Sequence, residues 1–512
     1  MTFNSIPFLI FYPCVLLGYF GTRLLPEKIG SQARWIFLLL ASYFFYMYSQ
    51  PALIVLILFT TLVSWVSSLV IEKLDGKISS GSLSEKEIAR AKRRKKWCLA
   101  LTLISSLGVL FFFKYFIFIC ESVFGIVGFF TGQAYRINLN LILPVGISFY
   151  TFQTLSYAID VYRGKIRTER HFGYYALFVS FFPQLVAGPI ERPANLLPQL
   201  RTRLPVTRED VGYGLRKMML GFFKKIAIAD LISVYVNSIY NNLDGFETVP
   251  ALGVVIATLL FAVQIYCDFS GYSDIAIGCA RIMGIRLMKN FDRPYTAKTV
   301  REFWGRWHLS LSTWFRDYLY IPLGGSRCAK WRHLLNVAIV FLVSGLWHGA
   351  AWTFVIWGAL HAVYQIVGIL TLPLRNRLLT KLKLSPDGRL IRCVRTFNTF
   401  LLVDFAWLFF RANSTSDFGK LLSALFSGAS WRVPIQSVLS SMQLTVPAIL
   451  LLVLSLALLL LVDRLVLHHD EPSGSGAMVR RGAFICVTWI VIFAWTYLMA
   501  NDLTSTFIYF QF

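Results

Sequence analysis

Long apolar runs recur along the whole chain, and short segments rich in lysine and arginine separate them. A helix rises 1.5 Å per residue, so about 20 apolar residues cross the hydrocarbon core of a bilayer. The runs predict about ten to twelve membrane-spanning helices. They lie near residues 6–25, 35–49, 52–71, 98–120, 142–161, 251–267, 334–348, 351–372, 397–410, 446–462 and 483–499.

The middle of the chain has a different pattern. Between residues 172 and 330 the apolar runs are short, interrupted by prolines and dense in basic residues. Irregular backbone persists at membrane depth only where protein buries it or where it lines a cavity. We therefore expect re-entrant and interfacial helices here, on the cytoplasmic side. No internal repeat is visible, which disfavours an inverted-repeat transporter. The sequence predicts an all-α polytopic membrane protein that forms a single domain over residues 1–512.

Two basic segments predict the orientation. Residues 73–96 contain the run Lys92-Arg93-Arg94-Lys95-Lys96, and residues 375–395 form a second basic loop. Because lysine and arginine are enriched in cytoplasmic loops, both segments should face the cytoplasm. Counting spans outward from each segment places the N-terminus and the C-terminus outside the cytoplasm.

Composition supports the membrane assignment. Hydrophobic residues make up 56% of the chain, and charged residues make up 15%, well below the roughly 25% of soluble domains. The formal net charge of +24 fits loops beside anionic lipid headgroups, and no nucleic-acid motif accompanies it. The eight cysteines are scattered without a CxxC pair, so neither a disulfide framework nor a metal site is expected. The first apolar run lacks the features of a cleaved signal peptide.

His348 is the first candidate for chemistry, in the stretch "SGLWHGAAW" that begins at Ser344. Ionisable groups deep in a membrane are costly and are usually functional. Gly345 and Gly349 form a GxxxG contact face for another helix. Helical spacing predicts Ser344 and Trp352 on the same face as His348. The alternative is a neutral histidine that only makes a hydrogen bond inside a helix bundle.

A second candidate lies in the segment "REFWGRWHLSLSTWFRDYLYIPLGG" from Arg301. Helical spacing predicts one stripe that holds Arg301, Trp304, His308 and Ser312. The mixture of tryptophan, tyrosine and arginine is also typical of an interfacial helix, which is the alternative interpretation. That alternative does not explain a histidine on the aromatic face.

A third candidate is "QIYCDFSGYSDIAIG" from Gln264, near the end of an apolar run. Carboxylates inside a membrane should be paired, so Asp268 and Asp274 favour structural ion pairs. Orientation of a catalytic histidine is the alternative role. The candidate partners are Arg281, Arg286 and Arg293. Three further histidine positions are weaker: His333 in a basic loop, His361 on an apolar helix, and the tract His468-His469-Asp470-Glu471 beside a Ser/Gly linker.

These stretches together resemble the membrane-bound O-acyltransferase superfamily, and within it the bacterial branch that includes the alginate O-acetyltransferase membrane subunit. The resemblance covers essentially the whole chain. It rests on the three segments above and on "PVGISFYTFQTLSYAIDVYRG" from Pro144, "FFPQLVAGPIER" from Phe181, "NFDRPY" from Asn290, "SGLWHGAAWTFVIWGALH" from Ser344 and the ending "FIYFQF".

The resemblance implies a helical bundle around a central tunnel that joins a cytoplasmic donor side to an extracytoplasmic funnel. His348 corresponds to the invariant family histidine, and His308 corresponds to the second motif histidine. The expected supporting residues are Asn290, Asp268, Asp274, Gln264, Ser344, Trp304, Ser312 and Trp347. Histidine titrates near working pH, so neutral His348 is expected to take the proton of an acceptor hydroxyl. His308, Asn290 or a backbone N–H is expected to stabilise the oxyanion.

The expected activity is transfer of an acyl group, most simply acetyl, from a cytoplasmic thioester to a hydroxyl for O-acetylation of an extracytoplasmic polysaccharide such as alginate, or of the cell wall. The donor is acetyl-CoA or an acyl carrier protein, with no permanently bound cofactor. An extracytoplasmic esterase-like partner of the SGNH type and a location in the bacterial inner membrane are also implied. D-alanyl transfer to teichoic acids is the alternative within the family. A transporter or flippase of a polysaccharide precursor, and an assembly scaffold, are the alternatives outside it.

Overall fold

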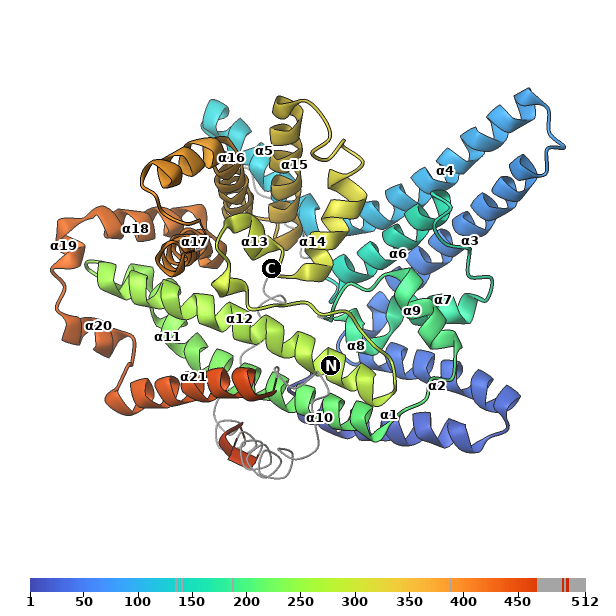
Figure 1. The fold of residues 1–512 in the computed structure, drawn as a ribbon, viewed down its shortest axis with the longest axis horizontal. Coiled ribbons are helices and arrows are strands. Elements are labelled where there is room, and N and C mark those ends of the chain that lie inside the picture. The colour runs from blue at the N-terminus through green and yellow to red at the C-terminus, as the bar shows by residue number, and fades with distance from the viewer. Residues whose placement is uncertain are drawn as a thin grey trace. The chain divides into compact units, whose positions relative to one another are not determined.

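The computed structural model describes residues 1–133, 137, 139, 141–186, 188–386, 388–466, 490–491 and 494–496. Every regular element in these residues is a helix, which confirms the expected all-α class (Figure 1). The chain divides into two compact units. The first unit is Met1–Gly214 with Ala276–Met288, and the second is Leu215–Ile275 with Lys289–Phe512. The single domain expected over 1–512 stays a prediction.

The first unit packs around a serine- and threonine-rich face of helix α3 (Ile54–Ser79). Small residues let membrane helices approach closely, and α3 contacts α4, α6 and α7. The Ser64 hydroxyl lies 2.6 Å from that of Tyr175 on α7. The other helices of this unit are α1 (Ile6–Gly21), η1 (Thr22–Leu24), α2 (Glu27–Met47), η2 (Pro51–Leu53), α4 (Glu85–Leu110), η3 (Phe111–Tyr115), α5 (Phe116–Thr131), α6 (Ile147–Tyr162), α7 (Phe172–Ser180), α8 (Phe182–Leu185) and α9 (Pro193–Arg201).

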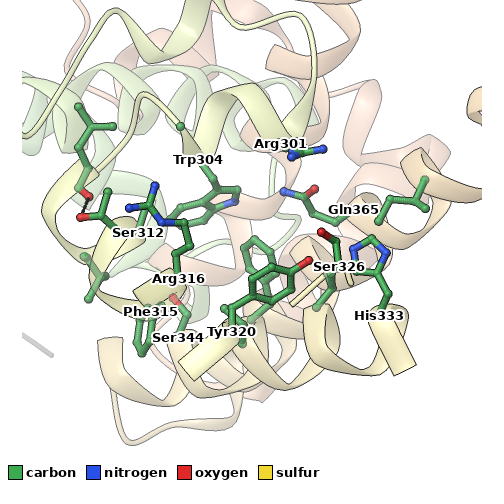
Figure 2. Close-up of a pocket in the computed structure, with 18 residues that line it drawn as sticks. Arg301, Trp304, Ser312, Phe315, Arg316, Tyr320, Ser326, His333, Ser344 and Gln365 are labelled. Atoms are coloured by element: carbon green, nitrogen blue, oxygen red, sulfur yellow. Dashed lines mark hydrogen bonds between the residues drawn. The ribbon is translucent and has the colours of Figure 1, made fainter. Parts of the chain in front are cut away.

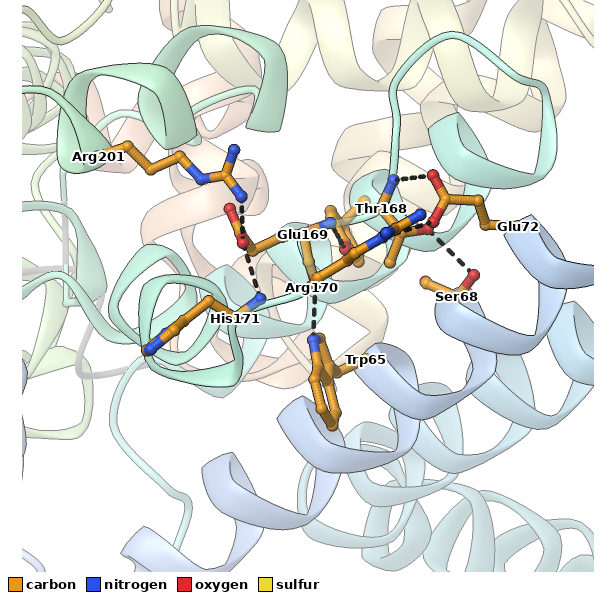
Figure 3. Close-up of polar contacts among 9 residues, drawn as sticks. Trp65, Ser68, Glu72, Thr168, Glu169, Arg170, His171 and Arg201 are labelled. Atoms are coloured by element: carbon orange, nitrogen blue, oxygen red, sulfur yellow. Dashed lines mark hydrogen bonds and ion pairs between the residues drawn. The ribbon is translucent and has the colours of Figure 1, made fainter.

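A buried carboxylate holds the segment between α6 and α7. Glu169 is 3% exposed; it accepts a hydrogen bond from the backbone N–H of His171 at 2.9 Å and pairs with Arg201 of α9 (Figure 3). Its backbone oxygen accepts from the Trp65 indole of α3 at 2.7 Å. Because Glu169 contacts α3, α9 and the start of α7, it fixes the entry to α7.

The second unit contains the candidate site. Its helices are η4 (Phe223–Asp230), α11 (Leu231–Tyr240), η5 (Leu243–Gly245), η6 (Pro294–Thr296), α13 (Val300–Trp304), α14 (Leu309–Phe315), η7 (Arg316–Tyr320), α15 (Lys330–His348), α16 (Trp352–Lys381), α17 (Arg389–Arg411), α18 (Thr415–Phe426), α19 (Gly428–Trp431), α20 (Ile435–Ser441) and α21 (Val446–Val466). Helices α10 (Arg208–Phe222) and α12 (Ala251–Ile282) contribute residues to both units.

Helices α15 and α16 form a close pair, side by side in Figure 1. A Cβ atom on Gly345 would lie 3.2 Å from the Cα of Gly358 and too close to the carbonyl oxygen of Phe354. A Cβ on Gly349 would overlap the Phe354 ring. The close helix contact predicted from the GxxxG spacing is therefore confirmed.

Fewer helices than the ten to twelve expected pass a test of length and apolar composition. In the described residues six helices are long and apolar enough to cross a membrane, or seven if the bent pair Ile435–Ser441 and Val446–Leu461 is one span. The runs near 35–49, 142–161 and 334–348 do form α2, α6 and α15, but these helices are shorter or carry more polar residues. Most of the run near 483–499 lies outside the described residues.

Two local expectations in the basic and central segments were wrong. The basic run Lys92–Lys96 is not in a loop but on α4, where Lys95 pairs with Asp75 of α3 at 2.6 Å. The apolar run that was expected to end near Cys267 continues as α12 to Ile282. Ion pairs with lysines of α10 and η4 allow this helix to bury Asp268 and Asp274.

Candidate active site

His348 is the last residue of α15. Gly349 follows with an extended backbone, φ −163°, and α16 begins at Trp352. The expectation that Trp352 shares a face with His348 is therefore wrong, because the helix ends between them; Trp352 is 50% exposed. The His348 ring is 3% exposed and has aromatic neighbours, with ring centroids at 4.9 Å for Trp357 and 5.3 Å for Phe410.

His308 does not lie on a helical stripe. Helix α13 ends at Trp304, and His308 has the left-handed conformation, φ 46° and ψ 55°, immediately before α14. The predicted stripe was wrong because this break turns the histidine away from its neighbours in the spacing. Arg301, Trp304 and Ser312 line a common pocket, whereas the His308 ring points to Asn290.

Asn290 fixes the tautomer of His308. Its side-chain oxygen accepts from the Ser310 backbone N–H at 3.3 Å and from the Ser310 hydroxyl at 2.9 Å. The Nδ1 atom of His308 lies 3.0 Å from the same oxygen. A carbonyl oxygen only accepts hydrogen bonds, so Nδ1 carries the proton and Nε2 keeps a lone pair. The Asn290 amide nitrogen donates to the Ser273 hydroxyl of α12 at 3.1 Å.

His308 is also held in its neutral form. Its side chain is fully buried, and this burial lowers its pKa from 6.5 to about 3. The ring of Phe269 packs edge-on against it at 4.6 Å. At neutral pH the histidine therefore presents an unprotonated Nε2, which is the form that accepts a proton.

Trp347 connects the two histidines. Its ring centroid lies 5.8 Å from that of His308 and 4.8 Å from that of His348. Trp347 is 5% exposed. The structure thus brings together the two histidines that the sequence singled out, 40 residues apart in the chain, around one indole.

A pocket of about 510 Å³ lies beside these residues (Figure 2). Its volume is within the range of about 300–1,000 Å³ that is usual for ligand sites. Trp304, Ser312 and Ser344, all expected to support the site, line it. Neither His308 nor His348 lines it, but Leu309 does, and Ser344 is one turn before His348 on α15. The other polar lining residues are Arg301, Arg316, Tyr320, Ser326, His333 and Gln365.

The carboxylates of α12 form buried ion pairs, but not with the arginines expected. Asp274 lies between Lys217 at 2.9 Å and Lys224 at 2.8 Å. Asp268 pairs with Lys225 at 2.8 Å. The partners were wrong because these lysines come from α10 and η4, whereas Arg281 pairs with Asp210. The expectation that Asp268 and Asp274 form buried ion pairs is confirmed, and their role in orienting a histidine stays a prediction.

Lys225, which the sequence analysis did not single out, pairs with a second carboxylate besides Asp268. It contacts Asp230 at 2.8 Å, and both side chains are 1% exposed. Burial by itself lowers the pKa of Lys225, but Asp268 and Asp230 raise it overall. The adjacent lysines in the apolar stretch "GFFKKIAIAD" were the missed signal. Gln264, also on α12, is buried one turn before Asp268.

Sequence reasoning also missed the residues that hold the site in place. Ser273 and Ser310 are ordinary serines until the fold brings both to Asn290. His361, judged weak, is fully buried and accepts a hydrogen bond at its Nδ1 from the Trp304 indole at 3.2 Å. His333 lines the pocket. The tract His468-His469-Asp470-Glu471 and the ending "FIYFQF" lie outside the described residues.

Two buried histidines around one indole, beside a pocket of ligand size, are an arrangement that suits an active site in a helical membrane protein. Residues 38–383 match the model of the MBOAT, membrane-bound O-acyltransferase family. The chain belongs to this family, and it is a membrane O-acyltransferase.

Three relatives illustrate the similarity. The chain is 33% identical to a probable alginate O-acetylase AlgI of Pseudomonas putida over 100% of both chains. It is 31% identical to a peptidoglycan O-acetyltransferase of Helicobacter pylori, over 83% of this chain and 80% of that protein. It is 32% identical to a teichoic acid D-alanyltransferase of Bacillus subtilis, over 44% of this chain and 58% of that protein.

Proposed function

We propose that this enzyme transfers an acetyl group from a thioester on the cytoplasmic side of the bacterial inner membrane to a hydroxyl for O-acetylation of an extracytoplasmic polysaccharide. The observation that carries the proposal is the fixed, neutral His308 that shares Trp347 with His348. Acyl transfer to a hydroxyl needs a proton acceptor, and a pair of buried imidazoles, one of them preset in its neutral form, can accept the proton and orient the hydroxyl.

The pocket suits the donor. Arg301, Arg316 and His333 give it a basic character, and apolar side chains such as Val337 and Phe341 form its walls. Phosphates bind to arginine through charge-assisted hydrogen bonds, and the walls suit a pantetheine arm. The basic segment around His333 should be cytoplasmic by the positive-inside bias. Acetyl-CoA and an acyl carrier protein both present phosphate followed by such an arm.

The transfer itself needs one proton movement. The acceptor oxygen attacks the thioester carbonyl, a C–O bond forms, and the C–S bond breaks. The hydroxyl proton passes to a histidine and then to the departing thiolate, which leaves as a thiol. We assign proton acceptance to His348, with His308 Nε2 as an acceptor that orients the hydroxyl or shares the proton.

The hydrogen bonds disfavour the oxyanion role that the sequence suggested for His308 and Asn290. The single proton of neutral His308 is on Nδ1 and points to Asn290. The Asn290 amide points to Ser273. A group whose N–H is already used at 3.0–3.1 Å is not available to a developing oxyanion, so this role falls to a backbone N–H or to another side chain.

The relatives favour acetyl over D-alanyl. The similarity to the alginate O-acetylase spans the full chain, whereas that to the teichoic acid D-alanyltransferase spans 44% of it. We propose alginate or a similar exopolysaccharide as acceptor, reached through an extracytoplasmic SGNH-type partner. We also propose that both chain termini lie on the extracytoplasmic side, because the basic segments favour the cytoplasm.

Turnover of radiolabelled acetyl-CoA by purified protein in nanodiscs tests the proposal. We expect wild type to release coenzyme A, and His348→Ala and His308→Ala to lose at least about 100-fold, as expected for a general base. His171→Gln is the matched control, because this histidine is exposed in the first unit and should leave turnover unchanged. All variants must show the same thermal unfolding. Equal turnover in wild type and both alanine variants would refute the assignment.

Asn290→Ala tests the positioning role separately. Without the amide oxygen the Nδ1–H tautomer loses its support, so we expect kcat to fall while the KM for acetyl-CoA stays within about twofold. Asn290→Asp keeps the acceptor oxygen and adds a negative charge, which favours protonated His308. The pH profile of kcat should then move to higher pH. An unchanged profile in Asn290→Asp would show that Asn290 acts only structurally.

A further inference from the structure

A second basic pocket lies at the start of α17. It has a volume of about 660 Å³ and is open at the protein surface. Residues of the η6 segment and of the first turns of α17 line it. Three cations, Lys298, Arg389 and Arg392, line it, and no acidic residue does. Among the residues that the structure describes, none of these three side chains pairs with a carboxylate. The nearby Glu302 carboxylate accepts from the Lys298 backbone N–H at 2.8 Å and pairs with Arg306, but it does not line the pocket. The lining itself therefore carries a net positive charge.

The floor of this pocket is aromatic and rigid. Tyr295 donates a hydrogen bond to the Ala262 backbone oxygen of α12 at 2.6 Å and accepts one from the Trp407 indole at 3.2 Å. The ring of Phe400 packs edge-on against Tyr295 at 5.5 Å. Phe397, another lining residue, is 61% exposed. The cavity thus combines three cations with aromatic side chains in one lining.

Its position matches the boundary of a bilayer. Arg389–Arg411 is one of the candidate spans, so Arg389 and Arg392 lie at the end of a membrane helix. Phe397 is about 12 Å from Arg389 along the helix axis. Exposed apolar side chains continue the line past it, with Leu401 at 44% and Phe405 at 38%. A ligand held here has its charge among headgroups and its apolar part along α17.

We propose that this pocket binds an anionic glycerophospholipid, with the phosphate among Lys298, Arg389 and Arg392 and an acyl chain along Phe397 and Leu401. The charge selects the headgroup, because three cations repel the ammonium of a zwitterionic lipid and attract a net negative one. The apolar line selects a lipid over a soluble phosphate. This site is separate from the proposed donor pocket, and its test needs no turnover.

The test is lipid retention on the delipidated full chain, measured by native mass spectrometry after exchange into detergent micelles that contain phosphatidylglycerol or phosphatidylcholine. We expect preferential retention of phosphatidylglycerol. Arg389→Gln/Arg392→Gln should weaken it by roughly 30-fold, the loss of two cations at a membrane surface. Arg377→Gln/Lys381→Gln is the matched control, since these exposed cations of α16 do not line the pocket.

Three outcomes would overturn the proposal. Equal retention of phosphatidylcholine would remove the charge selection. Unchanged retention in Arg389→Gln/Arg392→Gln would place the lipid elsewhere. Competition by inorganic phosphate or desulfo-coenzyme A would identify a soluble phosphate ligand instead of a lipid. Thermal unfolding of both double variants in plain detergent verifies that they fold.

Discussion

Lys225→Met tests whether the buried charges between η4 and α12 hold the second unit together. Lys225, Asp230 and Asp268 are each 1% exposed, and both lysine–carboxylate distances are 2.8 Å. Removing the lysine leaves two buried carboxylates without the cation between them. Breaking a buried pair in this way costs about 3–5 kcal/mol, a large fraction of the about 5–15 kcal/mol by which proteins are stable.

The chain offers a matched control in Lys289→Met. Lys289 and Asp292 form the same type of pair at 2.9 Å, but their side chains are 62% and 54% exposed. Exposed pairs contribute about 0–1 kcal/mol, because water screens the charges. The two substitutions remove the same group at nearly the same distance, so any difference between them reports burial.

The assay is the free energy of unfolding from SDS titration in mixed micelles, with helical circular dichroism as the signal. We expect Lys225→Met to lose at least about 3 kcal/mol more than Lys289→Met. Combining Lys225→Met with Asp230→Leu and Asp268→Leu should restore most of the loss, because an apolar core replaces the charges. Equal losses in the two single variants, or no recovery in the triple variant, would refute the reasoning.

Two further predictions concern stability. Gly345→Ala should destabilise the protein by about 1–3 kcal/mol through overlap with Phe354, whereas Gly368→Ala, with open space around it on α16, should stay within about 1 kcal/mol; the same SDS titration compares them. Burial lowers the pKa of His308 from 6.5 to about 3, so on acidification the unfolded chain binds a proton at this histidine before the folded chain does. The free energy of unfolding of wild type should therefore fall by about 1 kcal/mol between about pH 6.5 and about pH 5.5, relative to that of His308→Gln. Equal pH dependence of the two free energies would contradict this.

Apolar runs sufficed to predict helices because length and hydrophobicity decide where a chain crosses a membrane. The run near 334–348 became α15, which ends at His348. The ion-pair partners were beyond reach, since Lys224 and Asp274 are 50 residues apart and nothing local relates them. What the pattern did contain was a carboxylate inside an apolar helix, and such a group requires a cation somewhere.

The geometry of the site could not be predicted from the sequence, for a different reason. Spacing rules assume a continuous helix, and the chain leaves the helix between Trp304 and Leu309. Two backbone hydrogen bonds accompany the break: the Asp292 N–H donates to the Arg306 backbone oxygen and the Leu309 N–H donates to the Asn290 backbone oxygen, each at 2.9 Å. These bonds join residues 290–292 to residues 306–309. Hydrogen bonds between two separate loops leave no periodic pattern in the sequence.

These loop contacts explain why a histidine occupies a left-handed position. Positive φ is unfavourable for residues other than glycine by roughly 1 kcal/mol or more. Among the described residues only four non-glycine residues have it, and Arg293 and His308, both at φ 46°, lie in this loop pair. The strain persists because the bonds from Asp292 and Leu309 flank His308 on both sides. The left-handed conformation directs Nδ1 to the Asn290 side-chain oxygen, which holds the proton on Nδ1 and the lone pair on Nε2.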